Sequence, residues 1–447
     1  MVSAAEQLAK NINFSAFAKA EELKKRLWFV VLALLVFRLG THIPLPGIDP
    51  RVMEEIFKQN QNGLLGMFDM FSGGALKRMS IFALNIMPYI SASIIVQLMS
   101  SVVPSMEEMK KDGEAGRKRM NQYTRYLTVL LASVQAYGLA VGLESMSGPT
   151  GSAVINPGFF FRFVVVATLL GGTMFLMWLG EQMTSRGIGN GISLIIFAGI
   201  VAGLPSALVR TFELAKTQSI PTLLVLLIPA GVVAVVAFIV FMERAHRRII
   251  IQYPKRQMGA GIVGGEASHM PLKLNTSGVI PPIFASSLLM LPTTVLGFIG
   301  KDAPGWLTMV KDSFQRGQWV YMVLYSSLII FFSFFYTAVV FNPTETADNL
   351  RKYGGFIPGI RPGKSTADYL DFVLTRITVI GAAYLVFVCL LPEFLISKMN
   401  LPFYFGGTSL LIVVSVTMDT VAQVHSHLLA HQYEGLLKKA KLRGRRS

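Results

Sequence analysis

Long stretches almost free of charged residues recur along the chain, and they constrain its fold more than any other feature. A helix that crosses a lipid bilayer needs about 20 mostly apolar residues. Because unpaired backbone polar groups are costly in lipid, each stretch is expected to be helical. The period-2 alternation of a transmembrane strand is missing. The ten expected helices are Leu27–Ile43, Met79–Val103, Tyr126–Leu143, Phe159–Leu179, Gly191–Leu208, Pro221–Met242, Ser277–Ile299, Trp319–Phe341, Phe372–Leu391 and Phe403–Val421.

The composition agrees with a membrane protein. Hydrophobic residues make up 52% of the chain and charged residues only 15%, whereas a soluble domain carries roughly 25% charged residues. This excludes a soluble enzyme, a disordered chain and a disulfide-stapled secreted domain. Cys389 is the only cysteine, so the chain forms no internal disulfide and no cysteine-based metal site. The sequence predicts an all-α integral membrane protein.

The distribution of lysine and arginine predicts the orientation of the helices. The net charge is +16, with 41 lysine and arginine residues. Alternate loops hold 29 of them, and the loops on the opposite side hold 10. Cytoplasmic loops carry the excess of positive charge in membrane proteins. We therefore expect both termini in the cytoplasm, together with the basic segments 104–125, 180–190, 243–273 and 342–376.

The ten expected helices divide into two sets of five around an outer loop near 210–220. An odd number of helices in each set inverts one half relative to the other, which is the plan of an inverted repeat with a path at its interface. The expected parts are a cytoplasmic N-terminus 1–26, a first half 27–210, a second half 211–421 and a basic cytoplasmic tail 422–447.

No site that couples transport to an energy source is evident. The chain lacks a phosphate-binding GxxxxGK[ST] loop. Residues 259–264 spell GAGIVG, but no strand is evident before this motif and no helix after it, so we interpret it as a mobile loop. The centres of the apolar stretches contain no carboxylate of the kind found in ion-coupled transporters. Glu181, Glu243 and Asp419 fall near the predicted cytoplasmic ends.

The histidines of the tail also give little sign of chemistry. His425, His427 and His431 are spaced like metal ligands, but no cysteine or acidic cluster accompanies them. We expect no metal, no cofactor and no enzymatic activity. A membrane protein with an interior path and without an energy source of its own is typical of a passive conduit driven by a docked partner.

Three apolar segments depart from an ordinary membrane helix. Asn62–Leu76 is too short to span and is interrupted by glycines; it is either an outer surface helix or an element folded back into a cavity. Ile86 and Ile90 share one helical face, with Pro88 between them. The stretch 275–292 contains three prolines and several small polar residues, which suits a helix that bends or parts from a neighbour.

Two long cytoplasmic loops, 243–273 and 342–371, carry clustered basic residues. In the second loop, Arg361 lies between the turn signals Pro358-Gly359 and Pro362-Gly363. This charge is either ordinary positive-inside charge or a docking surface. Turn residues that present an arginine outward suit recognition of acidic groups on a protein or on ribosomal RNA.

At these residues the sequence resembles the SecY family, the central channel subunits of the bacterial Sec protein translocase. The resemblance extends from the first expected helix to the tenth and covers essentially the whole chain. The matching stretches include FSGGAL, SIFAL, IMPYISASII, GTMFLMWLGEQ, RGIGNGISLIIFAGIVAGLP, FIPGIRPG and PFYFGGTSLLIVV.

The resemblance implies a fold and a pore. The ten helices would form two pseudo-symmetric halves around an hourglass pore, closed at its narrowest point by a ring of apolar side chains. Such a ring excludes water when the pore is empty. Its side chains form no specific hydrogen bond with a passing polypeptide, which suits a channel that conducts polypeptides of any sequence. The residues that match the family's pore ring are Ile86, Ile90, Ile192, Ile196, Ile283 and Ile412.

The resemblance also implies moving parts and docking residues. Segment 62–76 would be the plug, with the apolar side chains of Leu64, Leu65, Met67, Phe68, Met70 and Phe71. Ser91 and Asn275 would belong to the lateral gate, which opens toward lipid. Lys255, Arg256 and Arg361 would dock partners. Asn85 departs from the family, which usually has glycine there, and puts an amide beside the ring.

The function implied by the resemblance is a protein-conducting channel in the bacterial inner membrane. It would move secretory polypeptides across the membrane and release membrane proteins into lipid when their signal sequences enter. The implied partners are the SecE and SecG subunits, and the SecA ATPase or the ribosome as the driving component. One alternative is a secondary transporter for a small solute, which would need an intramembrane ionisable or unwound site. Another alternative is a membrane-embedded scaffold that conducts nothing. The plug-like segment argues against it, because a scaffold has no pore to seal.

Overall fold

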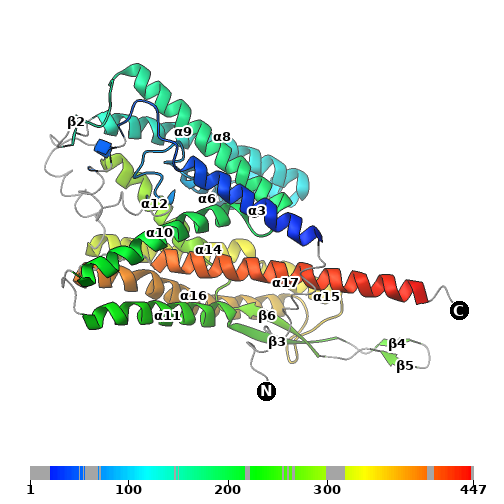
Figure 1. Ribbon diagram of the computed structural model, residues 1–447. Coiled ribbons are helices and arrows are strands. Elements are labelled where there is room, and N and C mark those ends of the chain that lie inside the picture. The colour runs from blue at the N-terminus through cyan, green and yellow to red at the C-terminus, as the bar shows by residue number, and fades with distance from the viewer. Residues whose placement is uncertain are drawn as a thin grey trace. The chain divides into compact units, whose positions relative to one another are not determined.

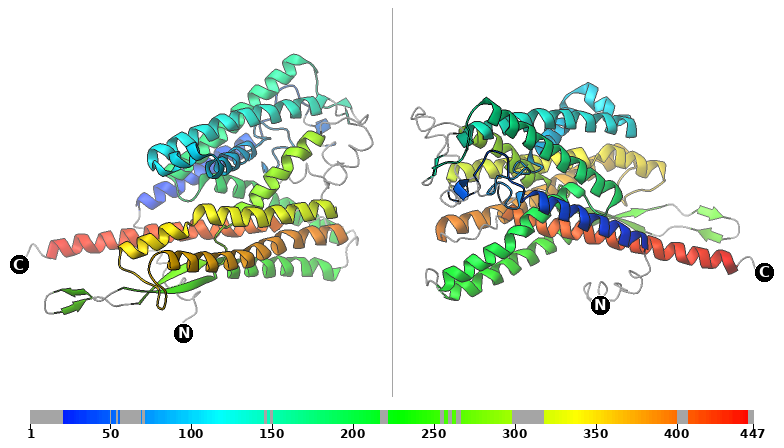
Figure 2. Two further views of the ribbon diagram at one scale, coloured as in Figure 1. Left: turned by 180° about the vertical axis from the view of Figure 1, so that it is seen from behind. Right: turned by 45° about the horizontal axis from the view of Figure 1, so that its top comes forward.

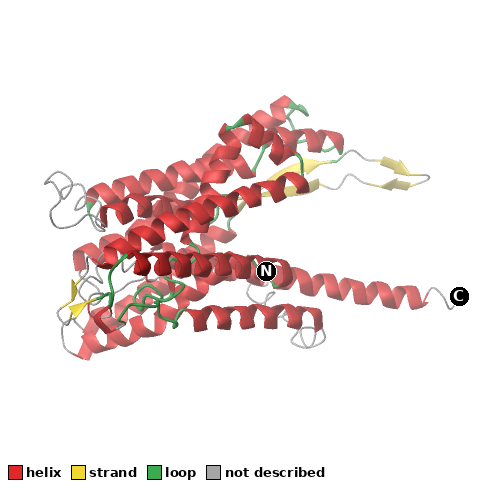
Figure 3. Cartoon of the chain, turned by 90° about the horizontal axis from the view of Figure 1, so that it is seen from above, coloured by secondary structure: helices red, strands yellow, loops and turns green. Residues whose placement is uncertain are grey.

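The computed structural model describes residues 21–49, 51–53, 55, 69, 72–144, 147–148, 151–216, 222–253, 256–258, 261–263, 267–297, 318–399 and 407–443. Figure 3 shows that helices dominate these residues. Their only sheets are three antiparallel pairs of short strands. The predicted all-α architecture is confirmed.

The helices overlap every one of the ten expected ranges. In chain order they are α3 (Glu21–Gly40), α6 (Met87–Val102), α7 (Pro104–Lys111), α8 (Glu114–Glu144), α9 (Phe159–Arg186), α10 (Gly191–Lys216), α11 (Thr222–Arg244), α12 (Ile280–Gly297), α14 (Trp319–Val340), α15 (Pro343–Lys352), α16 (Lys364–Met399) and α17 (Gly407–Arg443). The strands are β1 (Ser147–Gly148), β2 (Gly151–Ser152), β3 (His246–Gln252), β4 (Arg256–Met258), β5 (Gly261–Val263) and β6 (Ala267–Lys273).

Several of these helices are long and apolar enough to cross a membrane. By length and composition, five helices of the described chain meet that condition. The pair α6 and α7, bent by 103°, would make a sixth. The chain is therefore a multi-pass membrane protein, and the count of ten spans stays a prediction.

The chain forms two compact units. The first comprises residues 1–89, 125–205 and 416–447, and the second comprises residues 90–124 and 206–415. The inverted halves 27–210 and 211–421 stay a prediction. Each unit has a core of its own.

In the first unit, the segment before α6 is held between α3 and α9. The ring of Phe82 stacks on Phe37 and on Phe175, with ring centroids 6.3 and 5.9 Å apart. A Cβ at Gly40 would come within 2.0 Å of the Phe82 ring, and one at Gly172 within 2.1 Å of the Ile81 carbonyl oxygen. The two helices can therefore approach this segment only because glycine stands at both positions.

This segment corrects the expected second helix. A helix over Met79–Val103 was predicted, but α6 begins only at Met87, and residues 81–86 form consecutive turns. The N–H groups of Ala83, Asn85 and Met87 donate to carbonyls three residues earlier. Unwound backbone is tolerated at membrane depth when it is buried in protein and hydrogen-bonded. Pro88 lies in the first turn of α6, where its missing N–H costs no helical bond.

Backbone geometry explains the unusual Asn85. Its φ is +49°, in the left-handed region. Glycine enters this region freely, and asparagine is among the few other residues that do so routinely. Position 85 therefore accepts asparagine where the resemblance implies glycine, because both residues fit the same turn.

We predict that Asn85→Gly preserves stability and that Asn85→Val does not. A β-branched residue in the left-handed region costs about 1–2 kcal/mol, so the valine variant should unfold at a lower temperature in detergent. Asn85→Gly is the matched comparison, because glycine enters this conformation freely and adds no buried charge. Equal unfolding midpoints for the glycine and valine variants would contradict this explanation.

In the second unit, α14 packs against both α12 and α16 (Figure 2). Phe284 of α12 meets Phe332 of α14 edge-on, with ring centroids 5.7 Å apart. The start of α17 lies directly on α16, since a Cβ at Gly407 would be 1.9 Å from the Val388 carbonyl oxygen. A larger residue at position 407 would force the two helices apart.

Within the predicted loop 243–273, the described residues include two antiparallel strand pairs (Figure 1). Strands β3 and β6 pair from His246 opposite Lys273 to Gln252 opposite Ala267. Strand β5 lies within the GAGIVG motif and pairs with β4, so the expectation that no strand precedes the motif is wrong, whereas the mobility of this segment stays a prediction. The run Ile249–Ile251 favours a strand through its β-branched side chains, and Ile249 packs in the hydrophobic core of the unit.

Candidate functional site

The six predicted pore-ring isoleucines are divided between the two units. The first unit holds Ile86, Ile192 and Ile196, and the second holds Ile90, Ile283 and Ile412. Ile192 and Ile283 are half-buried, and the other four are buried. Ile86 ends the turns that precede α6 instead of lying in a helix. The role of the ring stays a prediction.

The tight connection between α9 and α10 positions two of the ring residues. The side-chain oxygen of Asn190 accepts hydrogen bonds from the N–H groups of Ile192 and Ser193, at 3.1 and 3.5 Å, and so caps α10. A Cβ at Gly191 would be 2.1 Å from the Gly180 carbonyl oxygen. The sequence GIGNGIS therefore fixes where α10 begins, and with it the face on which Ile192 and Ile196 lie.

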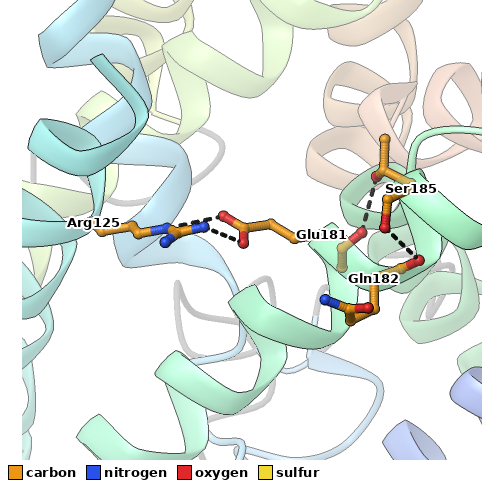
Figure 4. Close-up of polar contacts among 6 residues, drawn as sticks. Arg125, Glu181, Gln182 and Ser185 are labelled. Atoms are coloured by element: carbon orange, nitrogen blue, oxygen red, sulfur yellow. Dashed lines mark hydrogen bonds and ion pairs between the residues drawn. The ribbon is translucent and has the colours of Figure 1, made fainter. Parts of the chain in front are cut away.

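An ion pair joins α8 and α9 in the first unit. The Nη2 of Arg125 lies 2.5 Å from Oε2 of Glu181, and its Nε lies 3.2 Å from Oε1, so the contact is bidentate. Figure 4 shows the two groups facing each other, with the Ser185 hydroxyl turned toward the Gln182 carbonyl. Glu181 lies near the cytoplasmic end predicted for its helix, but its sequence position gives no sign of Arg125, which is 56 residues away.

In the second unit, Asn275 anchors the chain just before α12. Its Nδ2 donates to Oε1 of Glu243 at 2.6 Å and to the Gly278 carbonyl at 3.0 Å. The Ser277 hydroxyl donates to Oδ1 of Asn275. The expected helix Ser277–Ile299 begins only at Ile280, because Gly278 has a φ of +62°. Asn275 therefore ties the entry of α12 to the end of α11.

Ser91, the other predicted gate residue, is buried in α6. It belongs to the second unit, as Asn275 does. Assignment of both residues to a lateral gate stays a prediction. The contact between Glu243 and Asn275 leaves no pattern in the sequence, because the two residues are 32 positions apart.

The six predicted plug residues lie outside the described residues, but the end of the plug segment is described. Oδ1 of Asp69 accepts a hydrogen bond from the Lys77 N–H at 2.7 Å. Burial raises the pKa of the Asp69 carboxyl, and the Lys77 N–H opposes that shift. The Ser72 hydroxyl donates to the Asp69 carbonyl and accepts from the Leu76 N–H. Side-chain and backbone hydrogen bonds thus join Asp69, Ser72, Leu76 and Lys77.

Of the three predicted docking residues, Arg361 is exposed between turns and Arg256 lies in a strand. Lys255 lies outside the described residues, and Arg256 contributes backbone to β4. Arg361 is exposed between turns in which Gly359 and Gly363 have φ values of +81° and +109°. The Thr366 hydroxyl donates to the Arg361 carbonyl at 2.8 Å, so a fixed backbone presents this guanidinium to solvent.

The chain is similar to known proteins along most of its length. The SecY family profile matches residues 80–421. Protein translocase subunit SecY of Escherichia coli (strain K12) is 56% identical over 424 residues, which covers 95% of this chain and 96% of that protein.

Two solved structures show the same fold. One is a SecY protein whose plug domain is described as stabilising the closed state of the translocation channel and maintaining a membrane seal. It aligns with a TM-score of 0.64 at 18% identity, over 90% of this chain and 92% of that one. The other is Sec61 from a canine ribosome–channel complex, with a TM-score of 0.59 at 17% identity over the same shares.

Proposed function

The chain belongs to the SecY family, and from this premise we propose that it is a protein-conducting channel for polypeptides that cross or enter the bacterial inner membrane. The observation that carries the proposal is the 56% sequence identity with the translocase subunit of Escherichia coli, which extends over 95% of this chain. The chemistry of the predicted pore agrees with it. Isoleucine side chains at the narrowest point would exclude water and ions when the channel is empty, yet would make no hydrogen bond that selects one passing sequence over another.

Lateral release needs a helix that can part from its neighbour, and α12 suits that role. Its beginning is tied to α11 through Asn275 and Glu243. Pro281 and Pro282 lie in its first turn, and Pro292 lies further along the helix, where it removes a helical hydrogen bond. We propose that α12 moves in the lateral gate together with α6, which carries Ser91, while the Asn275 anchor stays in place.

The driving force would come from partners. The sequence lacks the phosphate-binding GxxxxGK[ST] motif, and the exposed Arg361 suits a partner with an acidic surface. We propose that SecA and the ribosome dock at the segment that carries Arg361, and that SecE and SecG are companion subunits. We also propose that both termini lie in the cytoplasm. The ribosome-bound Sec61 relative supports docking of a ribosome at this fold.

A disulfide crosslink tests the proposed path of the polypeptide. Cys389 is 1% exposed, and Cys389→Ala would remove this thiol without burying a new polar group. In that background we would introduce Ile412→Cys and stall a secretory precursor that carries its own cysteine. We expect a crosslink that depends on the signal sequence of the precursor.

The matched control is Val379→Cys, at an exposed position of α16, where we expect no crosslink to the stalled chain. Loss of the crosslink at position 412, with a control thiol of the precursor still reactive, would move the polypeptide path away from the isoleucine ring. It would also revive the secondary-transporter and scaffold alternatives.

A further inference from the structure

An unusual cation lies in the last turn of α3. Arg38 is half-buried in the first apolar helix, and within the described chain it forms no ion pair. Its Nη1 instead donates to the carbonyl oxygen of Gly73 at 2.7 Å, 35 residues further along. An ionisable group in a membrane helix is costly, and it marks a functional contact when its partner can be named.

A second arginine binds the next carbonyl. Nε of Arg78 donates to the Gly74 carbonyl oxygen at 3.2 Å. Both glycines are left-handed, with φ values of +67° and +84°, which turns their carbonyls toward the two guanidinium groups. We call this set of four residues, Arg38, Arg78, Gly73 and Gly74, the arginine clasp.

The clasp has little room to shift. A Cβ at Gly73 would lie 3.0 Å from Cα of Gly199 on α10 and 3.5 Å from Nη1 of Arg38. On its other side, the Asp69 carboxylate receives the Lys77 N–H. Helix packing, two cations and one carboxylate therefore restrain the same short loop.

The two cations are also close enough for their like charges to repel. The stability of α3 does not require a second cation beside Arg38, because a single cation near the end of the helix already complements the helix dipole. The carbonyls of Gly73 and Gly74 offset the repulsion only while the loop stays in place. The arrangement therefore links the charge of α3 to the position of the loop.

We propose that Arg38 is a positioning residue that fixes the C-terminal end of segment 62–76 through the arginine clasp and thereby favours the sealed state of the channel. The sealing role rests on the proposed function. The hold on the loop does not, because it follows from the contacts of Arg38 and Gly73. Loss of the guanidinium frees the Gly73 carbonyl and lowers the cost of moving residues 72–76.

The first test measures the loop itself. Hydrogen exchange is followed in the full-length chain with its companion subunits, in lipid nanodiscs, for wild type and Arg38→Leu. A hydrogen bond to a charged group is worth enough to change local opening about tenfold or more. We expect amide exchange at Gly74, Leu76 and Lys77 to accelerate by about that factor.

Two further variants make the result specific. Arg162→Leu removes another half-buried arginine of the same unit, which pairs with Glu144, and should leave exchange in residues 72–80 unchanged. Arg38→Met keeps a long side chain without a donor, for the case in which the leucine variant does not fold. Unchanged protection of residues 72–80 in Arg38→Met or Arg38→Leu, or faster exchange confined to α3, would overturn the proposal.

The second test measures the seal. In reconstituted vesicles without substrate, we expect Arg38→Leu to raise ion conductance severalfold over wild type and over Arg162→Leu. Faster exchange together with unchanged conductance would overturn the sealing role of Arg38 but support its contact with Gly73. If deletion of the plug segment also left conductance unchanged, the result would contradict the proposed function and not the arginine clasp.

Discussion

Deletion of Leu64–Phe71 should make the resting channel leak ions. If the plug keeps an open state at roughly 0.1–10% of the population, its removal should raise the conductance of substrate-free vesicles by about tenfold or more. Protein transport should continue in part, because the predicted isoleucine ring still surrounds the moving chain. Single-channel recording in planar bilayers measures the conductance, and a precursor-protection assay measures transport.

Variants of unchanged length separate a hydrophobic seal from a mere spacer. In one, all six apolar plug residues become serine; in the matched control, the same six become valine, which stays apolar. We expect the serine variant to leak like the deletion and the valine variant to resemble wild type. Equal, low conductance in the deletion and in both substituted channels would remove the plug assignment.

Sequence periodicity and hydropathy were sufficient for the helices but not for the places where a helix stops. The Met79–Val103 stretch is apolar throughout, yet its first part is unwound. The cause is tertiary: Gly40 and Gly172 let α3 and α9 close around Phe82, and the turn at Asn85 needs a left-handed residue. Pro88 signals an irregularity at this point but does not say on which side the helix lies.

The candidate site was predictable to a similar degree. The resemblance named the pore, plug and docking residues, because motifs are local in sequence. It could not name the pairs that hold those residues in place. Asn275 with Glu243 and Arg38 with Gly73 are more than 30 residues apart, and neither residue type demands the other. The pairing of β3 with β6 was missed for a related reason, since a basic, glycine-containing segment is equally typical of a loop.

Arg361→Glu should block partner-driven transport while the channel still assembles. Reversing an exposed charge at a complementary docking surface creates a like-charge contact, which costs several kcal/mol. A loss of about 2–5 kcal/mol corresponds to roughly 30-fold to a few thousandfold weaker binding. The fold should be unaffected, because Thr366 donates to the backbone carbonyl of Arg361 and not to its side chain.

The measurements are the affinity of purified SecA and of ribosomes for the reconstituted channel, and the rate of precursor transport. Arg351→Glu is the matched control, because it reverses an exposed arginine in the last turn of α15, in the same basic segment. If position 361 recognises acidic groups specifically, only its reversal removes docking, and high salt weakens wild-type docking as well. If both variants lose the same affinity for SecA and ribosomes, docking depends on the total positive charge of the segment and not on position 361. Normal transport by Arg361→Glu would exclude Arg361 as a docking residue.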